Sequence, residues 1–351
     1  MIRNRLVTPT TISMGAFALA YVAGWFIIAQ ILTSGIADWI VDRRNDGWTV
    51  EHGAITTDGF PYSWRASIAK PNIGLTKQDW DYRWSGPAIT LNWKPWSPRT
   101  VNYATRGPHK FHMGPPGGVP EATLQMANVQ GHLNFGPRGH LNQLAILLDD
   151  VRLSLPDLPS LRLNRFRAVI DTDPPANGVK PAQPHLIPSF RLDSDIYGLT
   201  LPERQHPPLG RTIGRIALDG TILGQIPPGR PSDTLAVWQN DGGTVEINRL
   251  ALGWGPLKVQ ATGTMALDPA LQPVAALTGT FTGYDGTLEA LVTAKMIKPG
   301  MARIGKFALG TMARPSSNGG RPEINVPVTL QKRWLYVGPL KLLQLPPIHW
   351  N

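Results

Sequence analysis

The feature that most constrains this chain is a long run without charged side chains, from Leu6 to Ala37. Within it, residues 13–32 are predominantly apolar, and about 20 helical residues at a rise of about 1.5 Å cover the roughly 30 Å of bilayer hydrocarbon. We therefore predict a transmembrane helix at 13–32. A cleaved signal peptide, with Ala18-Leu19-Ala20 as its cleavage site, would have a shorter apolar run, and a buried core helix would have a polar face.

Charges beside the span predict its orientation. Arg3 and Arg5 precede it, whereas two aspartates offset two arginines shortly after it. By the positive-inside rule, residues 1–12 form a cytoplasmic tail, and the rest of the chain lies in the periplasm, anchored in the inner membrane by a single span. Residues 33–47 are predicted to form a juxtamembrane helix that starts at Ser34 and ends at Gly47. A simple continuation of the anchor helix is the alternative.

Composition predicts many short strands joined by turns, because the chain holds 36 Gly and 34 Pro but only 17% charged residues. The absence of cysteine excludes disulfides, thiolate metal sites and a cysteine nucleophile. The formal net charge of +10 is scattered, without a basic run or a recognition helix. It therefore indicates a surface near anionic headgroups and disfavours nucleic acid as a partner.

Alternating apolar and polar residues predict a mainly β (α+β) fold with extended antiparallel sheet. The predicted strands share this alternation or a high content of β-branched and aromatic residues, and they lie at 62–68, 82–93, 122–134, 145–155, 161–170, 190–201, 213–222, 257–267, 274–282 and 324–330. Segments rich in Gly and Pro at 107–120 and 171–188 are predicted to be loops, because such composition suits neither a regular helix nor a central strand.

The Pro-rich loop at 173–188 is our predicted boundary between a first β-rich half, 48–172, and a second, 189–351. A long loop within one continuous sheet is the alternative. In the second half, helices are predicted at about 287–297 and 301–312, separated by Pro299-Gly300. Their apolar stripes, with Leu288, Leu291 and Val292 on the first and Ile304, Phe307, Ala308 and Met312 on the second, predict a helical pair that caps one end of a sheet.

Catalytic motifs are not found in the sequence: it has no nucleophile elbow, phosphate-binding loop, dinucleotide fingerprint or zinc-protease motif. His109 and His112 form a spaced pair, but two ligands without a nearby carboxylate are too few for a metal site. We therefore predict no catalytic residues, no metal and no cofactor, and expect that the protein is not an enzyme.

Several motifs resemble a known family. In the C-terminal half these are Gly253-Trp254-Gly255-Pro256-Leu257, Gly263, Leu267-Asp268-Pro269, Val326-Pro327-Val328 and Val337-Gly338-Pro339-Leu340, and in the N-terminal half Gly24-Trp25, Gly59-Phe60-Pro61-Tyr62 and Pro95-Trp96-Ser97-Pro98. The chain resembles the domain of unknown function 2125 family of alphaproteobacteria and, more distantly, the AsmA-like envelope proteins. The first resemblance implies a single-span inner-membrane protein with an exported β-rich domain and no catalytic residues to transfer. The second implies sheets that form grooves for lipid.

Most of the 12 tryptophans precede residue 97 and predict an aromatic wall. We expect Trp64, Trp84, Trp93 and Trp96 to line an apolar groove for a lipid or acyl chain. A structural or protein-interaction module of the envelope, with all apolar faces used as core, is the alternative. A continuous open apolar face favours the first hypothesis and a closed sandwich the second.

Overall fold

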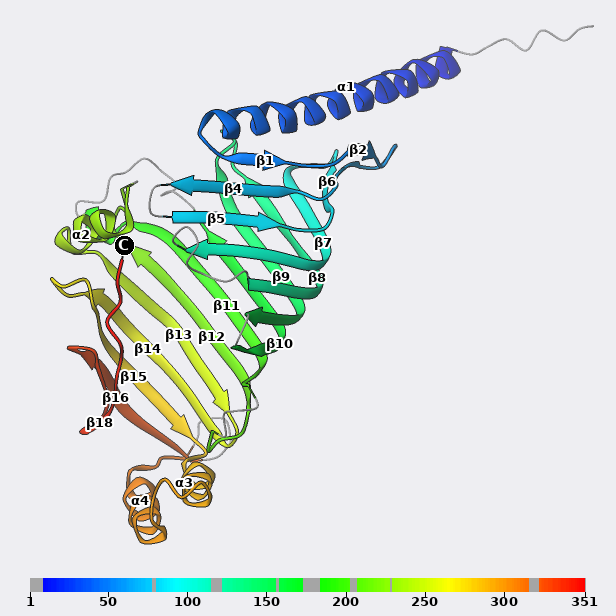
Figure 1. Cartoon of the computed structure of the whole chain (residues 1–351). Helices are drawn as coiled ribbons and strands as arrows, with labels where there is room; N and C mark the ends of the chain where they lie inside the picture. The colour runs from blue at the N-terminus through cyan, green and yellow to red at the C-terminus, as the bar shows by residue number, and fades with distance from the viewer. Residues whose placement is uncertain are drawn as a thin grey trace, which may run out of the picture. The chain divides into compact units, whose positions relative to one another are not determined.

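The computed structural model describes residues 9–77, 80–114, 122–155, 158–172, 184–202, 207–227, 229–315 and 322–350. It is mainly antiparallel β sheet, as predicted, and Figure 1 labels its elements. The chain separates into two compact units, Met1–Asn134 and Phe135–Asn351, which we call unit 1 and unit 2.

The N-terminal helix α1 spans Pro9–Asn45 without a break (Figure 1). The predicted separate helix starting at Ser34 is therefore wrong, and the alternative, continuation of the anchor helix, is confirmed. Gly47, at a φ of 86°, follows the helix end as expected. Among the described residues, the segment Leu19–Asn45 is long and apolar enough to cross a membrane, as an anchor or as a signal sequence.

Contacts with the strands and turns of unit 1 hold α1 from Tyr21 to Arg44. The Tyr21 hydroxyl donates to the carbonyl of Pro61, and the Arg44 guanidinium to that of Val50. The rings of Phe26 and Phe60 stack 6.2 Å apart. Part of the predicted span at 13–32 thus lies against the β2–β3 hairpin, which a hydropathy pattern does not reveal.

Unit 1 contains eight strands listed here in chain order: β1 (Thr49–Glu51), β2 (Ile55–Asp58), β3 (Trp64–Ile68), β4 (Asn72–Lys77), β5 (Trp80–Ser85), β6 (Ile89–Lys94), β7 (Ser97–Gly114) and β8 (Ala122–Phe135). The first half of β7 pairs with β6 and the second half with β5, while β8 pairs along its other edge. The long strand β7 therefore joins the series β2–β3–β6 and the series β1–β4–β5 into one sheet.

Two predictions for unit 1 are wrong. The strand expected at 82–93 is divided into β5 and β6, because Gly86 and Pro87 interrupt it and send both strands to β7. The loop expected at 107–120 is a strand as far as Gly114. A register shift between Thr105 and Gly107 against β8 accommodates the irregular residues, since bulges tolerate Gly and Pro. The rest of that predicted loop lies outside the described residues.

Unit 2 is an antiparallel meander in which each strand pairs with the next. Its strands are β9 (Leu141–Leu155), β10 (Leu158–Asp171), β11 (Pro188–Thr200), β12 (Thr212–Leu223), β13 (Thr244–Trp254), β14 (Leu257–Leu267), β15 (Pro273–Thr282), β16 (Glu323–Gln331), β17 (Trp334–Val337) and β18 (Leu340–Gln344), with a short 3-10 helix at Pro184–Leu186. All predicted strands of the second half are present.

The Pro-rich segment 173–188 connects neighbouring strands of unit 2. β10 pairs with β11 from Arg162 opposite Thr200 to Asp171 opposite Arg191, so this segment is a long connection within one sheet, the alternative that the sequence left open. Residues 173–183 lie outside the described part of the chain. The boundary between the two compact units lies instead between Asn134 and Phe135 in the sequence.

Helices lie at the strand ends of unit 2 (Figure 1). α2 (Pro231–Asn240) was not predicted; its buried Trp238 donates from Nε1 to the carbonyl of Leu223 at 2.7 Å. α3 (Tyr284–Thr293) and α4 (Pro299–Met312) form the predicted pair between β15 and β16. The expected inward stripe of α4 is wrong: small Ala302 is buried, whereas the stripe Ile304, Phe307 and Met312 is exposed.

Candidate ligand-binding face

Trp64 lies in a small aromatic cluster between α1 and β3. Its side chain is 8% exposed and packs against Trp25 and Ala29. The Trp64 indole donates to the carbonyl of Trp25 at 3.0 Å, and the Trp25 indole donates to the carbonyl of Ser63 at 3.0 Å. These reciprocal bonds satisfy both indole N–H groups, so Trp64 stabilises the packing of α1 on β3.

The other predicted groove residues are not gathered in one place. Trp93 is the cross-strand partner of Trp64 and packs against the same cluster. Trp84 lies on β5, stacked on His109 with ring centroids 5.9 Å apart, and its indole donates to His109 Nδ1 at 3.3 Å. Trp96 is 65% exposed in the turn after β6. The structure thus brings Trp64 and Trp93 together, and it gives Trp84 a protein partner of its own.

His109 and His112 do not converge on one point, because residues separated by three positions on β7 face opposite sides of the sheet. His109 is 3% exposed, and burial lowers its pKa, which favours the neutral ring whose Nδ1 can accept a hydrogen bond from the Trp84 indole. The described residues contain no group of three His, Asp or Glu that could hold a metal ion.

A row of large apolar residues crosses unit 2 at right angles to its strands. Consecutive register partners from β9 to β16 all belong to this row: Leu148, Phe166, Ile196, Ile216, Leu252, Val259, Phe281 and Ile324. Directly opposed residues of an antiparallel ladder project to the same face of the sheet. At a strand spacing of about 4.8 Å, the row is about 34 Å long. We call the face that carries it the apolar face.

Two further rows extend the apolar face. The adjacent row consists of Ile146, Ala168, Ser194, Leu218, Leu250, Ala261, Gly279 and Val326, and the next one contains Leu144, Ile170, Leu192, Gly220, Ile247, Gly263, Leu277 and Val328. Only Ser194 is polar in these rows. The apolar face therefore continues along the strands as well as across them.

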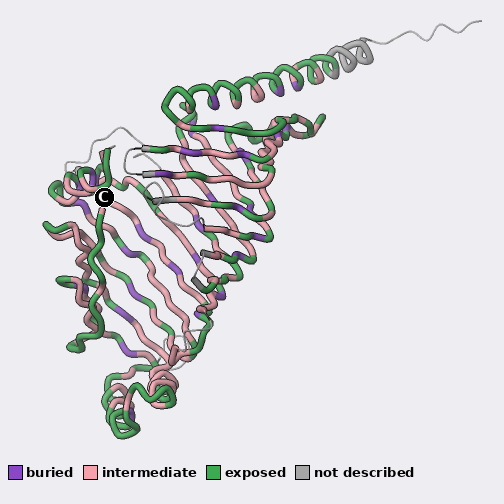
Figure 2. The backbone as a smooth tube through the Cα atoms, viewed as in Figure 1, coloured by how far each residue is buried: buried purple, intermediate pink, exposed green. Residues whose placement is uncertain are grey.

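Burial shows how the apolar face is covered. Of the first row, only Ile324 is buried, and its other members are half-buried. No large side chain of the described residues is less than 2% exposed. Figure 2 shows the strands of unit 2 as mainly intermediate, with isolated buried positions. In a closed sandwich the inner face would be fully buried, so within unit 2 the sheet is a single layer with an open apolar face.

The opposite face of unit 2 carries an Arg–Asp network, which we call the ionic face. Ion pairs between neighbouring strands are Arg165–Asp149 at 2.7 Å, Arg167–Asp193 at 3.4 Å, Arg191–Asp219 at 3.0 Å and Arg215–Asp195 at 2.5 Å. Arg249 of β13 reaches across β12 to Asp193 of β11 at 3.3 Å. Because a register slip of one residue would move these charges to the apolar face, the network specifies the register of the meander.

The pKa of Asp219 predicts how stability depends on pH. Hydrogen bonds from Arg191, and then from Asn248, hold this pKa below its ordinary value, although burial alone would raise it. A lowered folded-state pKa contributes stability above the unfolded-state pKa of about 3.9, and the contribution is lost as the pH falls through the folded-state value. We expect the free energy of unfolding, from urea titrations of the detergent-solubilised chain, to fall below about pH 4.

Asp219→Asn should weaken this pH dependence. Asp241→Asn, at an exposed position after α2, is the matched control and should keep it. Equal pH dependence in the two variants would contradict a role for the ionic face in acid sensitivity.

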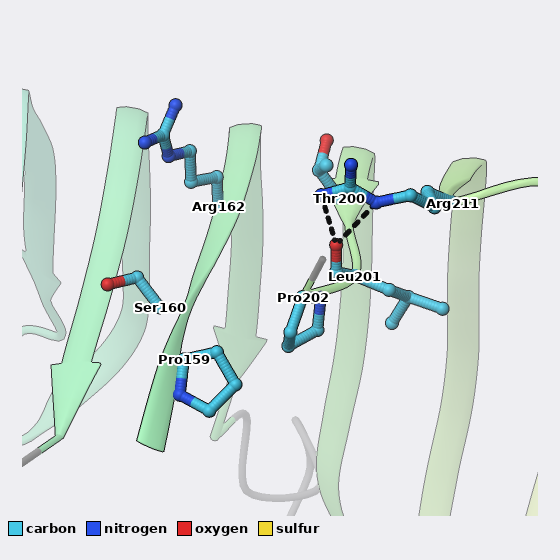
Figure 3. A pocket seen from close by; sticks show the side chains of 7 residues that line it. All are labelled: Pro159, Ser160, Arg162, Thr200, Leu201, Pro202 and Arg211. Atoms are coloured by element: carbon cyan, nitrogen blue, oxygen red, sulfur yellow. Dashed lines mark hydrogen bonds between the residues drawn. The ribbon is translucent and has the colours of Figure 1, made fainter. Parts of the chain in front are cut away.

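Two cavities among the described residues have polar linings. One of about 420 Å³, at the ends of β10 and β11, is lined by Pro159, Ser160, Arg162, Thr200, Leu201, Pro202 and Arg211, where Arg211 donates to the carbonyl of Leu201 (Figure 3). The other, of about 200 Å³ in unit 1, is lined by Asn72, Arg83, Ser85, Lys110 and His112. Their polar and basic linings do not suit a long acyl chain.

Beside the cavity of unit 1, Asp81 is 6% exposed and accepts hydrogen bonds from Arg83 at 2.7 Å and Thr76 at 3.0 Å. Burial alone would raise the pKa of Asp81, but these hydrogen bonds lower it. The carboxylate is thus a charged, structurally paired group.

The sequence predicted an apolar groove in the first half of the chain and did not locate the apolar face of unit 2, although the signal of that face was present. Alternation in the strands at 213–222 and 257–267 predicted that each has one apolar side. A continuous row appears only when the registers of all strands are known, and registers are not visible in a single strand.

Comparison with known proteins supports a family assignment. A family model described as "Uncharacterized protein conserved in bacteria (DUF2125)" matches residues 25–346. No curated protein and no solved structure matches the chain, and the more distant likeness to AsmA-like proteins stays a prediction. Because the model covers nearly the whole of both units, the chain belongs to the DUF2125 family.

Proposed function

We propose that this protein is a non-enzymatic, membrane-anchored envelope protein that binds or transfers a lipid-like ligand, with the ligand's acyl chain on the apolar face of unit 2. The row from Leu148 to Ile324 is the observation that carries this proposal. Its half-buried side chains still expose apolar surface that a chain of methylenes would cover. Each buried CH₂ contributes about 0.8 kcal/mol, so binding needs no polar recognition site.

The test of ligand binding uses the full chain in nanodiscs that contain a phospholipid with a photoactivatable acyl chain. We expect crosslinked peptides from β10 to β15 as well as from α1. Phe281→Arg should remove the crosslinks to the apolar face, because it places a charge in the row. Thr278→Arg, on the same strand but on the opposite face, is the matched control. Crosslinks confined to α1, unchanged by Phe281→Arg in a folded protein, would contradict the proposal.

Topology is a second test. We propose that α1 is an uncleaved anchor in the inner membrane with both units in the periplasm, supported by its charge-free run and by Arg3 and Arg5 before it. A reporter enzyme that is active only in the periplasm, fused after Asn351, should be active in intact cells. Activity of a cytoplasm-specific reporter at the same position would contradict this orientation.

A structural or protein-interaction module without ligand is the second candidate function. It is favoured by β18, an edge strand whose residues are all exposed, including Leu340 and Leu342. An exposed edge can pair with a strand of another envelope protein. Absence of lipid crosslinks on unit 2 would favour this function over lipid binding.

A further inference from the structure

The helical pair α3–α4 exposes an unusual amount of large apolar surface. Met296, in the loop between the helices, is 63% exposed, and the α4 residues Met301, Ile304, Phe307 and Met312 are 62%, 71%, 77% and 53% exposed. At about 100° per residue, these four α4 residues lie within one sector of the helix. We call this sector with Met296 the α4 stripe.

The α4 stripe is not required for the packing of the pair, because α4 uses its other side to contact α3. Ala302 is 6% exposed, and a Cβ added to Gly305 would lie 3.4 Å from a methyl group of Leu288. Lys306 also pairs with Glu289 of α3 at 2.5 Å. The apolar stripe is therefore available for contact with something outside the pair.

Positive charge surrounds the α4 stripe. No acidic residue occurs between Glu289 and Glu323. The described cations of this segment are Lys295, Lys298, Arg303, Lys306 and Arg314, and among the described residues only Lys306 has a carboxylate partner. A helix with exposed large apolar residues flanked by unpaired cations is typical of elements that lie in the interface of an anionic membrane.

We propose that α4 binds the surface of an anionic bilayer, with the α4 stripe inserted at the level of the headgroups and Lys295, Lys298 and Arg303 on anionic phosphates. The charges favour this occupant over a second copy of the chain, since a symmetric contact through the stripe would bring like charges together. The α4 stripe shares no residue with the apolar face or with α1, so it adds a membrane contact whether or not unit 2 carries a ligand.

Because the chain has no cysteine, a single fluorophore can report on the stripe. The full chain with Ile304→Cys carries an environment-sensitive dye and is held in phosphatidylcholine nanodiscs. It is titrated with vesicles that contain phosphatidylglycerol, and in a second arm the nanodiscs themselves contain this lipid. We expect the dye emission to shift to the blue in at least one arm and not to shift with phosphatidylcholine alone. The same dye at Val237→Cys, on α2 at 45% exposure, should not respond.

Two sets of substitutions at exposed positions separate charge from apolar contact. Replacing Lys295, Lys298 and Arg303 with Gln should weaken the apparent affinity for anionic vesicles about 100-fold, since each cation near an anionic surface contributes about 1 kcal/mol. Phe307→Ser should reduce the blue shift but keep the preference for anionic over neutral lipid. The proposal would be overturned by no response in either arm or by an equal response to neutral lipid. It would also be overturned if the dye shifted without anionic lipid while the particle mass doubled, since that result indicates contact with a second copy of the chain.

Discussion

Trp64→Ala is expected to destabilise unit 1 by about 3–5 kcal/mol, the range for removal of a large buried aromatic side chain. Trp64 is 8% exposed, and its loss leaves a cavity between α1 and β3 beside Trp25 and Trp93. It also removes the indole that donates to the Trp25 carbonyl. The measurement is equilibrium unfolding of the detergent-solubilised chain, followed by circular dichroism so that the lost fluorophore does not affect the signal.

Two companion variants make this expectation sharper. Trp64→Phe keeps most of the ring but loses the N–H donor, and should cost clearly less than Trp64→Ala. Trp96→Ala, at 65% exposure, should stay within about 0.5 kcal/mol of the wild type. If Trp64→Ala and Trp96→Ala lowered the free energy of unfolding equally, the described packing of α1 against β3 would be contradicted.

The elements that the sequence predicted well are those with strong local signals. Alternation over many residues at 257–267 and 274–282 predicted β14 and β15 almost to the residue, because each strand has one apolar and one polar side. The charge-free run likewise predicted α1, although not its continuation to Asn45, since Ser34 and Gly35 are compatible with either a cap or a helix interior.

What could not be predicted depends on contacts between distant segments. Gly107 and Pro108 have the composition of a loop, and they belong to a sheet only because β7 pairs with β5 and β8. The stripe of α4 has the periodicity of a core-facing helix, yet Ala302 is the buried residue and Gly305 lies closest to Leu288 of α3. Trp64 and Trp84 gave the same aromatic signal, but one packs on α1 and the other on His109.

Ala261→Asp should be the most damaging single substitution in unit 2. Ala261 is 4% exposed on β14, between its cross-strand partners Leu250 and Gly279. A carboxylate there would lie within the apolar face without a donor or a cation, and an uncompensated buried charge costs about 3–5 kcal/mol. Urea unfolding of the full chain at neutral pH should show the loss, and the loss should shrink at a pH where the new carboxyl is protonated.

Gln260→Asp is the matched control because it introduces the same side chain one residue earlier on the same strand. Gln260 is exposed, and it belongs to the face of β14 that continues from the ionic face. A carboxylate there stays hydrated, so its effect should remain within about 0.5 kcal/mol. Equal losses at residues 260 and 261 would mean that burial does not distinguish the two faces of β14, which would contradict the assignment of this strand to the apolar face.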